Sequence, residues 1–268
     1  MKDEKIYVLG TDQIELDRLK LQHDLWKDHL IRLWKKSNFR PGQKILELGC
    51  GPGFTTEDLA IYTNHESEIT AVDISEVFLK YLDSKKIPKL KTHLSFIEKL
   101  NISEKNFDGA FCRWLMIFVP DIETAIQKIA EHLKPGAIFS LQEYISYDSF
   151  SLAPDQPIMK KIVDAIFKSW MDQGGFPNQG RKLPMALEKN GFKVLEIEPI
   201  ARICRPQDPL WQWPETFFKS FLPRLVMTNH ITAADQIEFF RIWELSKETE
   251  GAFCITPTVV NIIAQKKM

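Results

Sequence analysis

The sequence predicts an α/β protein with a mostly parallel sheet, helices on both faces and a helical cap. Between residues 44 and 144, short apolar runs alternate with segments of helical periodicity. Repeated βα units of this kind build parallel sheets that helices cover on both faces. After Tyr144 the alternation stops and resumes only near residue 183, which predicts inserted segments.

The elements follow one another in a regular order. Residues 14–36 carry apolar side chains at helical spacing with charges between them, and predict a long helix before the first strand. Strands are then expected over 44–48, 68–72, 92–96, 107–113, 137–144 and 192–198, and helices over 55–62, 76–84, 121–132, 157–171 and 183–190. Asp121 is the candidate N-cap of its helix, and "VVNIIAQKK" predicts a final antiparallel strand.

The insertions divide a single compact domain into five stretches. The N-terminal helix and the ligand-binding core are expected over 1–145, a cap insertion over 146–180, a return to the core over 181–205, a second insertion over 206–250 and the final strand over 251–268. Four of the seven tryptophans fall in the two insertions. We expect these insertions at the carboxyl ends of the strands, where open α/β sheets bind ligands.

The composition is that of a soluble globular protein, with 44% hydrophobic and 26% charged residues. A net charge of −1 gives no basic field that would attract nucleic acid. No apolar run approaches the about 18 residues that cross a membrane, and "MKDEKIYVLG" does not have the pattern of a signal peptide. The four cysteines form no CxxC pair and the six histidines no HxxxH pair, so we expect reduced thiols, a cytoplasmic location and no metal. Nothing in the sequence indicates the oligomeric state.

The stretch "ILELGCGPGFTT" reads as a strand, a tight turn and the start of a helix. Glu47 precedes Gly49, Gly51 and Gly53, and glycines here let a ligand approach the backbone N–H groups of the turn. Asp73 lies 20 residues beyond Gly53, where a βαβ unit places the acid that binds ribose hydroxyls. The alternatives are an ordinary glycine-rich loop and a helix-capping aspartate.

The loop departs from the dinucleotide fingerprint G-x-G-x-x-G, because Phe54 occupies the sixth position. Glu47 also suits a ligand with positive charge. S-adenosylmethionine carries an ammonium and a sulfonium and no phosphate, so these residues favour a methyl donor over a nicotinamide dinucleotide.

Four motifs together, "ILELGCGPG", "AVDIS", "FDGAFCRWLMIFVPD" and "LKPGAIF", resemble those of class I S-adenosylmethionine-dependent methyltransferases of the small-molecule type, over roughly residues 40–145. The resemblance implies a Rossmann-like seven-stranded sheet whose last strand is antiparallel. It further implies that Glu47, Gly49, Gly51 and Gly53 line the methionine end and that Cys112 and Arg113 present backbone groups to it. Asp73 would hold the ribose hydroxyls, and Ile74 would pack on the adenine.

Two parts of the donor site are less regular. Phe96 stands where many relatives have an acid for the adenine amino group, so either Glu98 or the backbone amide of Ile97 is expected to make that contact. The helix "ELDRLKLQHDLW" resembles the N-terminal segment of small-molecule methyltransferases, where Arg18 or Gln22 would reach the donor carboxylate; a solvated helix face is the alternative.

For the acceptor, "GGFPNQGRKLP" resembles a loop of quinone-type methyltransferases and places Arg181 near the acceptor, unless it pairs on the surface. Glu143 and Tyr144 end the fifth strand as candidate catalytic groups, but alternation sends them to opposite faces, so at most one enters the site. Glu143 has a supporting salt bridge as its alternative role. Trp211 and Trp213 in "LWQWP" are candidate acceptor contacts, or part of the cap's own core.

The sequence therefore predicts methyl transfer from S-adenosylmethionine to a small, apolar or aromatic acceptor, at O, C or N, with S-adenosylhomocysteine as product. The alternatives are a nicotinamide-dependent oxidoreductase and a non-catalytic S-adenosylmethionine-binding protein. Protein or nucleic-acid methylation is disfavoured, because the chain has no basic tract and no NPPY-like motif.

Overall fold

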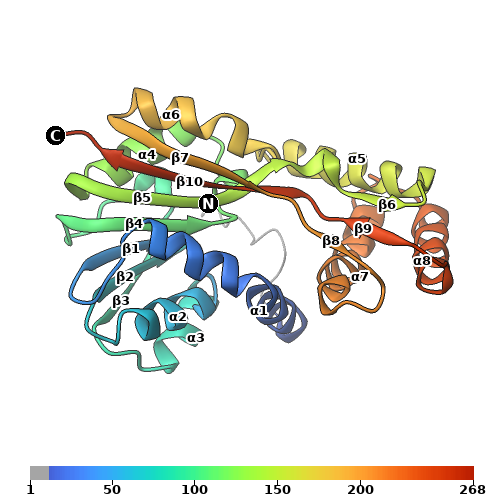
Figure 1. The fold of residues 1–268 in the computed structure, drawn as a ribbon, viewed down its shortest axis with the longest axis horizontal. Coiled ribbons are helices and arrows are strands. Elements are labelled where there is room, and N and C mark those ends of the chain that lie inside the picture. Colours follow the sequence, from blue (N-terminus) through green and yellow to red (C-terminus); the bar gives the residue numbers. More distant parts are fainter. Residues whose placement is uncertain (1–11) are drawn as a thin grey trace.

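The computed structural model describes residues 12–268, which form a seven-stranded sheet with helices on both faces and a cap at one end (Figure 1). The strand order is β3-β2-β1-β4-β5-β10-β7, and β10 is antiparallel to both of its neighbours. The strands of this sheet are β1 (Lys44–Leu48), β2 (Glu68–Asp73), β3 (Leu90–Leu94), β4 (Phe107–Arg113), β5 (Leu133–Ser146), β7 (Phe192–Ile200) and β10 (Thr258–Lys266). The predicted fold class is confirmed, including the antiparallel last strand.

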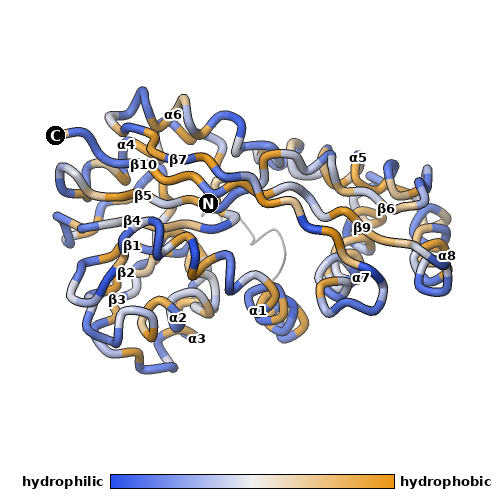
Figure 2. Tube along the Cα trace, in the orientation of Figure 1, coloured by the Kyte–Doolittle hydropathy of each residue, from blue (hydrophilic) through white to orange (hydrophobic). Residues whose placement is uncertain are grey.

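The helices agree closely with the sequence pattern as far as residue 190. They are α1 (Gln13–Lys36), α2 (Phe54–Tyr62), α3 (Glu76–Ser84), α4 (Ile122–Ala130), α5 (Pro157–Asp172), α6 (Leu183–Lys189), α7 (Gln212–Met227) and α8 (Ala233–Glu248). Asp121 caps α4 by accepting a hydrogen bond from the backbone N–H of Thr124, as expected. Hydrophobic and hydrophilic residues alternate along α1 (Figure 2), as its spacing predicts.

Two strands and one region differ from the expectation. Strand β5 begins at Leu133 and ends at Ser146, whereas a strand over 137–144 was expected. Strand β3 lies two residues earlier than predicted, because Ser95 N–H bonds to Asp73 O and the chain then enters a 3₁₀ turn at Ile97–Lys99. In the second insertion, the sequence pattern did not predict helices α7 and α8. The sequence also gave no indication of a second, three-stranded sheet in the cap, built from β6 (Ser151–Ala153), β8 (Ile203–Cys204) and β9 (Phe253–Ile255).

The pleat of the large sheet sends alternate residues to two separate cores. Ile45, Ile69 and Phe111 face α1 and α2, whereas Leu46 and Ala110 belong to the core under α4 and α6. The same alternation decides which polar side chains at the strand ends reach the face under α1. The odd-numbered residues Glu47, Asp73 and Arg113 continue the series of Ile45, Ile69 and Phe111.

The cap is held by aromatic side chains. Trp211 and Trp243 pack with their ring centroids 4.4 Å apart, and Phe218 and Phe239 lie against the Trp243 ring. This cluster continues without a break to Trp114 and Tyr144 at the end of the large sheet. The cap therefore shares one core with the end of the sheet that it covers.

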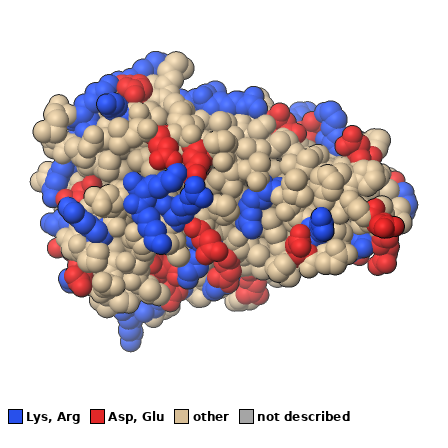
Figure 3. Space-filling view, in the orientation of Figure 1, with Lys and Arg blue, Asp and Glu red and all other residues tan. Residues whose placement is uncertain are grey.

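The surface carries charges of both signs, and Figure 3 shows basic side chains beside acidic ones across the middle of one face. Arg32 and Lys36 of α1 pair with Glu198 of β7 at 2.8 and 3.1 Å. Among the helices of residues 12–268, none combines the length and apolar character that crossing a bilayer requires. In the same part of the chain, no group of three His, Cys, Asp or Glu side chains is placed to hold a metal ion.

Candidate functional site

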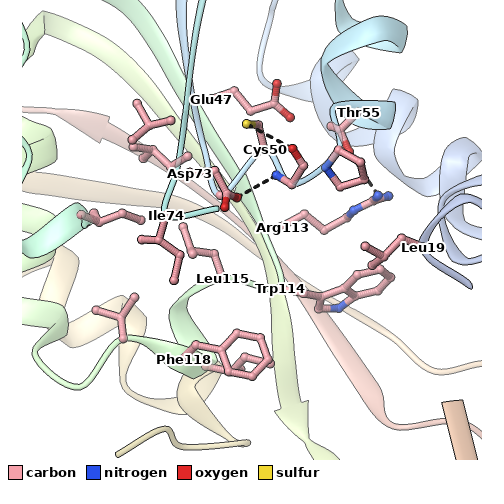
Figure 4. A pocket seen from close by; sticks show the side chains of 18 of the residues that line it. Leu19, Glu47, Cys50, Thr55, Asp73, Ile74, Arg113, Trp114, Leu115 and Phe118 are labelled. Carbon is pink, nitrogen blue, oxygen red and sulfur yellow. Dashed lines mark hydrogen bonds between the residues drawn. The ribbon is translucent and has the colours of Figure 1, made fainter. Parts of the chain in front are cut away.

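A cavity of about 460 Å³ opens at the carboxyl ends of β1, β2 and β4, between α1 and the cap (Figure 4). This volume lies in the range of small-molecule sites, roughly 300–1,000 Å³. One end is lined by the glycine loop and by polar groups of the strand ends. The other end is lined mainly by aromatic side chains.

The glycine loop adopts a backbone that only glycine takes without strain. Gly49, Gly51 and Gly53 all have positive φ angles, of +66°, +52° and +81°. A Cβ on Gly51 would meet no atom within 4 Å, so the loop is open there, whereas a Cβ on Gly53 would lie 2.2 Å from Leu82 Cδ1. Gly49 and Gly51 line the cavity, but Gly53 does not. Gly53 instead lets α2 begin close against α3, the helix that carries Leu82.

Asp73 ends β2 and connects the glycine loop to the start of α3. It is 6% exposed, and its two carboxylate oxygens accept hydrogen bonds of 2.8 Å from the backbone N–H groups of Gly51 and Ser75. Burial raises the pKa of Asp73, and these backbone bonds oppose the rise. Ser75, not Asp73, is the N-cap of α3, so helix capping does not account for this aspartate.

Glu47 is a buried carboxyl group at the cavity wall. Burial raises its pKa to about 7, and Thr56, which is placed to donate a hydrogen bond to it, and the nearby Arg113 oppose the rise. Within residues 12–268 its Oε2 atom has no hydrogen-bond partner. A carboxylate with one oxygen left open in this position can receive a positively charged donor group from a ligand.

Arg113 ends β4 beside Glu47 and links the strand to α1 and α2. Its Nη2 atom lies 3.1 Å from both Thr55 Oγ1 and His23 Nδ1, and Asp58 Oδ2 is 2.8 Å from the other nitrogen of His23. Burial lowers the pKa of Arg113 to about 10, so the guanidinium stays charged at neutral pH. Its Nη1 atom has no partner in the described part of the chain.

Helix α1 covers the cavity, and both residues expected from it are present in the lining. Arg18 forms a two-pronged ion pair with Glu15, with both N···O distances 2.7 Å. Gln22 accepts hydrogen bonds from Arg18 (3.1 Å) and from the indole N–H of Trp213 (2.9 Å). The helix face is therefore not solvated, and α1 is fastened to the cap through Gln22.

The residues expected to surround adenine lie together at one side of the cavity. Ile74, Phe96, Ile97 and Glu98 all line it. The side chain of Ile97 is buried, so its contribution to a ligand is its backbone and the packing of this wall. Cys112 is fully buried on the opposite face of β4 and does not line the cavity.

Glu143 and Tyr144 point to opposite faces, as the alternation requires. Tyr144 lines the cavity. Glu143 is fully buried beneath the loop that follows β4, where its Oε1 accepts hydrogen bonds of 2.7 Å from the backbone N–H groups of Leu115 and Met116. Burial raises the pKa of Glu143 to about 8. Among residues 12–268 it forms no salt bridge, so it supports this loop through backbone hydrogen bonds, and it does not line the cavity.

The three cap residues expected near the acceptor lie outside this cavity. The Arg181 side chain is 53% exposed and donates to Ile145 O at 2.7 Å. Trp211 is buried in the cap core. Trp213 is buried between α1 and the sheet, with its ring centroid 4.9 Å from that of Trp26 and 5.9 Å from that of Trp114. Trp213 borders a small second cavity of about 20 Å³ and does not line the large one.

The aromatic end of the cavity is built by residues that sequence reasoning did not single out. They are Trp114, Ile117 and Phe118 after β4, Trp170, Gln173 and Gly175 at the end of α5, and Phe217 of α7. Trp114 and Phe118 lie within the motif "FDGAFCRWLMIFVPD", directly after the predicted strand 107–113. Their position at the carboxyl end of a strand could have identified them as cavity residues. For Trp170 and Phe217 the sequence carries no signal that separates a lining residue from the cap core.

Comparison with known proteins agrees with this architecture. Residues 45–136 match the methyltransferase domain family. An O-methyltransferase of Pyrenophora dematioidea is 31% identical over 173 residues, which cover 62% of this chain and 60% of that protein. A demethylmenaquinone methyltransferase of Staphylococcus haemolyticus is 24% identical over 197 residues, covering 66% of this chain and 78% of that protein. The match to the Pyrenophora relative thus spans about three fifths of its length.

Among solved structures, the YcgJ protein of Bacillus is similar with a TM-score of 0.60 and 14% identity, covering 90% of this chain and 99% of that one. At this identity the similarity establishes the fold. The fold, the matched domain and the relatives together confirm the family resemblance stated from the motifs.

Proposed function

Residues 45–136 of this chain are a methyltransferase domain of class I, and from this premise we propose that the chain transfers a methyl group from S-adenosylmethionine to a small acceptor. The observation that carries the proposal is the two-ended cavity. Its polar end holds Glu47 and Asp73 beside the glycine loop, and its aromatic end lies directly under the cap. The acceptor is apolar or aromatic, since rings line the space left for it.

The residues at the polar end fit the donor. Asp73 is placed for the ribose hydroxyls, and the partnerless Oε2 of Glu47 suits the α-ammonium group, which would hold Glu47 ionised. Arg113, with a partnerless Nη1, suits the α-carboxylate. When bound, S-adenosylmethionine supplies a methyl carbon activated by the sulfonium; the acceptor forms a bond to this carbon as the C–S bond breaks and its electron pair passes to sulfur. The chain's contribution is to align the acceptor and to exclude water.

The two alternative functions gain no support. Phe54 begins α2 and lines the cavity at the position where a dinucleotide site has its third glycine. A non-catalytic binder would not require the aromatic space beside the donor end. For the compartment we propose the cytoplasm, in keeping with four cysteines that are free and buried, including Cys204 and Cys254, which face each other across β8 and β9.

A binding comparison followed by a turnover screen tests the proposal. S-adenosylmethionine and S-adenosylhomocysteine at 100 times their Kd should stabilise the protein by about 2.7 kcal/mol, and NADH at the same concentration should not. Incubation with fractionated small metabolites should then yield a product heavier by one methyl group, dependent on S-adenosylmethionine. Stabilisation by NADH alone would favour the oxidoreductase. Donor binding without turnover of any fraction would favour the non-catalytic binder.

A further inference from the structure

Tyr144 places a hydroxyl group among the aromatic rings of the cavity. Its side chain is 7% exposed, and its ring stacks on Trp114 with 5.8 Å between centroids and 18° between planes. Tyr147 packs edge-on against the same ring with 5.2 Å between centroids. These contacts fix the ring, and hence the hydroxyl, in one orientation.

Tyr144 lines the large cavity and, unlike Glu47 and Arg113, is not among the residues whose polar atoms are fully buried without a partner. No hydrogen bond joins its hydroxyl to another group within residues 12–268, so a ligand or water in the cavity has to complete it. Burial raises the pKa of Tyr144 above its ordinary value and Glu143 adds to the rise, although Arg18 and Arg113 both oppose it. The hydroxyl therefore keeps its proton at neutral pH and is available as a hydrogen-bond donor.

The cavity lining that Tyr144 shares holds two guanidinium groups, one of them ion-paired with Glu15, as well as the acidic side chains of Glu47, Asp73 and Glu98. Arg18 from α1 and Arg113 from β4 line the same cavity and interact electrostatically with Tyr144. Glu143, the acidic group nearest in sequence, lies on the other face of the sheet. A donor hydroxyl beside two guanidinium groups stabilises a negative charge and disfavours a positive one.

We propose that Tyr144 recognises the acceptor, and that the acceptor is a planar phenol or enol that binds as its oxygen anion. This inference rests on the proposed methyl transfer and names its substrate class. The ring of the acceptor packs among Trp114, Trp170 and Phe217, and its oxygen receives the Tyr144 hydrogen bond. Because the acceptor loses its proton to solvent before it binds, Tyr144 acts as a donor and not as a general base.

The test uses 4-nitrophenol, whose phenolate absorbs at longer wavelength than the neutral phenol, added to the protein saturated with S-adenosylhomocysteine. We expect the bound ligand to be the phenolate, with an apparent pKa at least one unit below that of free 4-nitrophenol. Tyr144→Phe should weaken phenolate binding at least tenfold and abolish most of this pKa shift. Tyr147→Phe is the matched control, because Tyr147 is buried against the same ring but does not line the large cavity; there the affinity should change less than twofold.

Four results would overturn the inference: binding of the neutral phenol, unchanged phenolate affinity in Tyr144→Phe, tighter binding of benzyltrimethylammonium than of the phenolate, or no binding of 4-nitrophenol at all. Calorimetric binding of S-adenosylhomocysteine, measured in the same samples, separates this inference from the proposed function. If S-adenosylhomocysteine binds and the phenolate behaves as in one of these results, the substrate class is wrong and the methyltransferase proposal stands. If S-adenosylhomocysteine itself fails to bind, both are wrong.

Discussion

Replacing Asp73 with asparagine tests the donor site while keeping the shape of the side chain. In the native protein each carboxylate oxygen accepts one backbone hydrogen bond of 2.8 Å, from Gly51 and from Ser75. Asparagine keeps one oxygen and loses the charge, so the ribose hydroxyls lose at least one charge-assisted hydrogen bond. Such a bond contributes roughly 1.5–3 kcal/mol, which corresponds to a loss in affinity of about 10- to 100-fold.

The fold should tolerate Asp73→Asn. Burial raises the pKa of Asp73, so the folded protein disfavours the ionised carboxylate, and a neutral amide relieves that cost. This gain offsets part of the lost hydrogen bond to the loop. We therefore expect the free energy of unfolding to change by about 1 kcal/mol or less.

The assay is isothermal calorimetry with S-adenosylhomocysteine, accompanied by urea denaturation. Asp108→Asn is a matched control, since Asp108 also accepts a backbone hydrogen bond (from Lys44, 2.8 Å) together with one from Lys134 (2.7 Å), but lies at the amino end of β4. Its affinity for S-adenosylhomocysteine should stay within twofold of the native value. An unchanged Kd in folded Asp73→Asn, or an equal loss in both variants, would refute the assignment.

Four further predictions follow from the same geometry. Gly51→Ala should weaken S-adenosylhomocysteine binding more than it lowers the free energy of unfolding, since a Cβ there meets no neighbouring atom. Gly53→Ala should lower the free energy of unfolding by about 1–3 kcal/mol, because its Cβ would overlap a neighbouring side chain. If both variants lost binding affinity and stability in the same proportion, this distinction between the two glycines would be wrong. Glu143 has its pKa raised from 4.5 to about 8, so its contribution to stability is complete below pH 4.5 and is lost as the pH rises through 8. Glu143→Gln should remove that decline, measured by urea unfolding at about pH 6 and about pH 9, and an identical decline in both proteins would count against it. Trp213→Phe keeps an aromatic ring but loses the indole hydrogen bond to Gln22 of α1. The affinity for S-adenosylhomocysteine, measured by calorimetry, should therefore fall about fivefold. An unchanged affinity would mean that other contacts hold α1 over the cavity. Arg181→Ala should leave both donor affinity and turnover within twofold, because this side chain lies outside the cavity, and a tenfold loss of turnover would return it to the acceptor site.

The local pattern of the sequence determined the core of the fold and the donor end of the site. Strand and helix periods are properties of neighbouring residues, so the boundaries of β1, β4 and α3 follow from the sequence alone. Glu47, Gly49, Gly51 and Asp73 stand at fixed offsets from strand ends, and parallel strands bring their carboxyl ends to one edge. The spacing of these residues therefore predicted that they would share a cavity.

The cap was harder to read because its sequence carries weaker local signals. Helix α7 contains Pro223 in its interior, which breaks the usual helical pattern. Helix α8 does begin with a capping box formed by Thr232 and Asp235, a signal that could have marked its start. The strands β6, β8 and β9 are each two or three residues long, too short for a period of two to stand out.

Only the tertiary structure decided which aromatic residues face the ligand space. Trp170 and Phe217 line it, whereas Trp211 and Trp213 are buried in packing contacts, although all four are large apolar side chains in the same two insertions. Their chemistry is the same, and they differ only in which side of each cap helix faces the sheet. The orientation of each helix depends on packing between segments far apart in the chain, and a local sequence pattern does not contain this information.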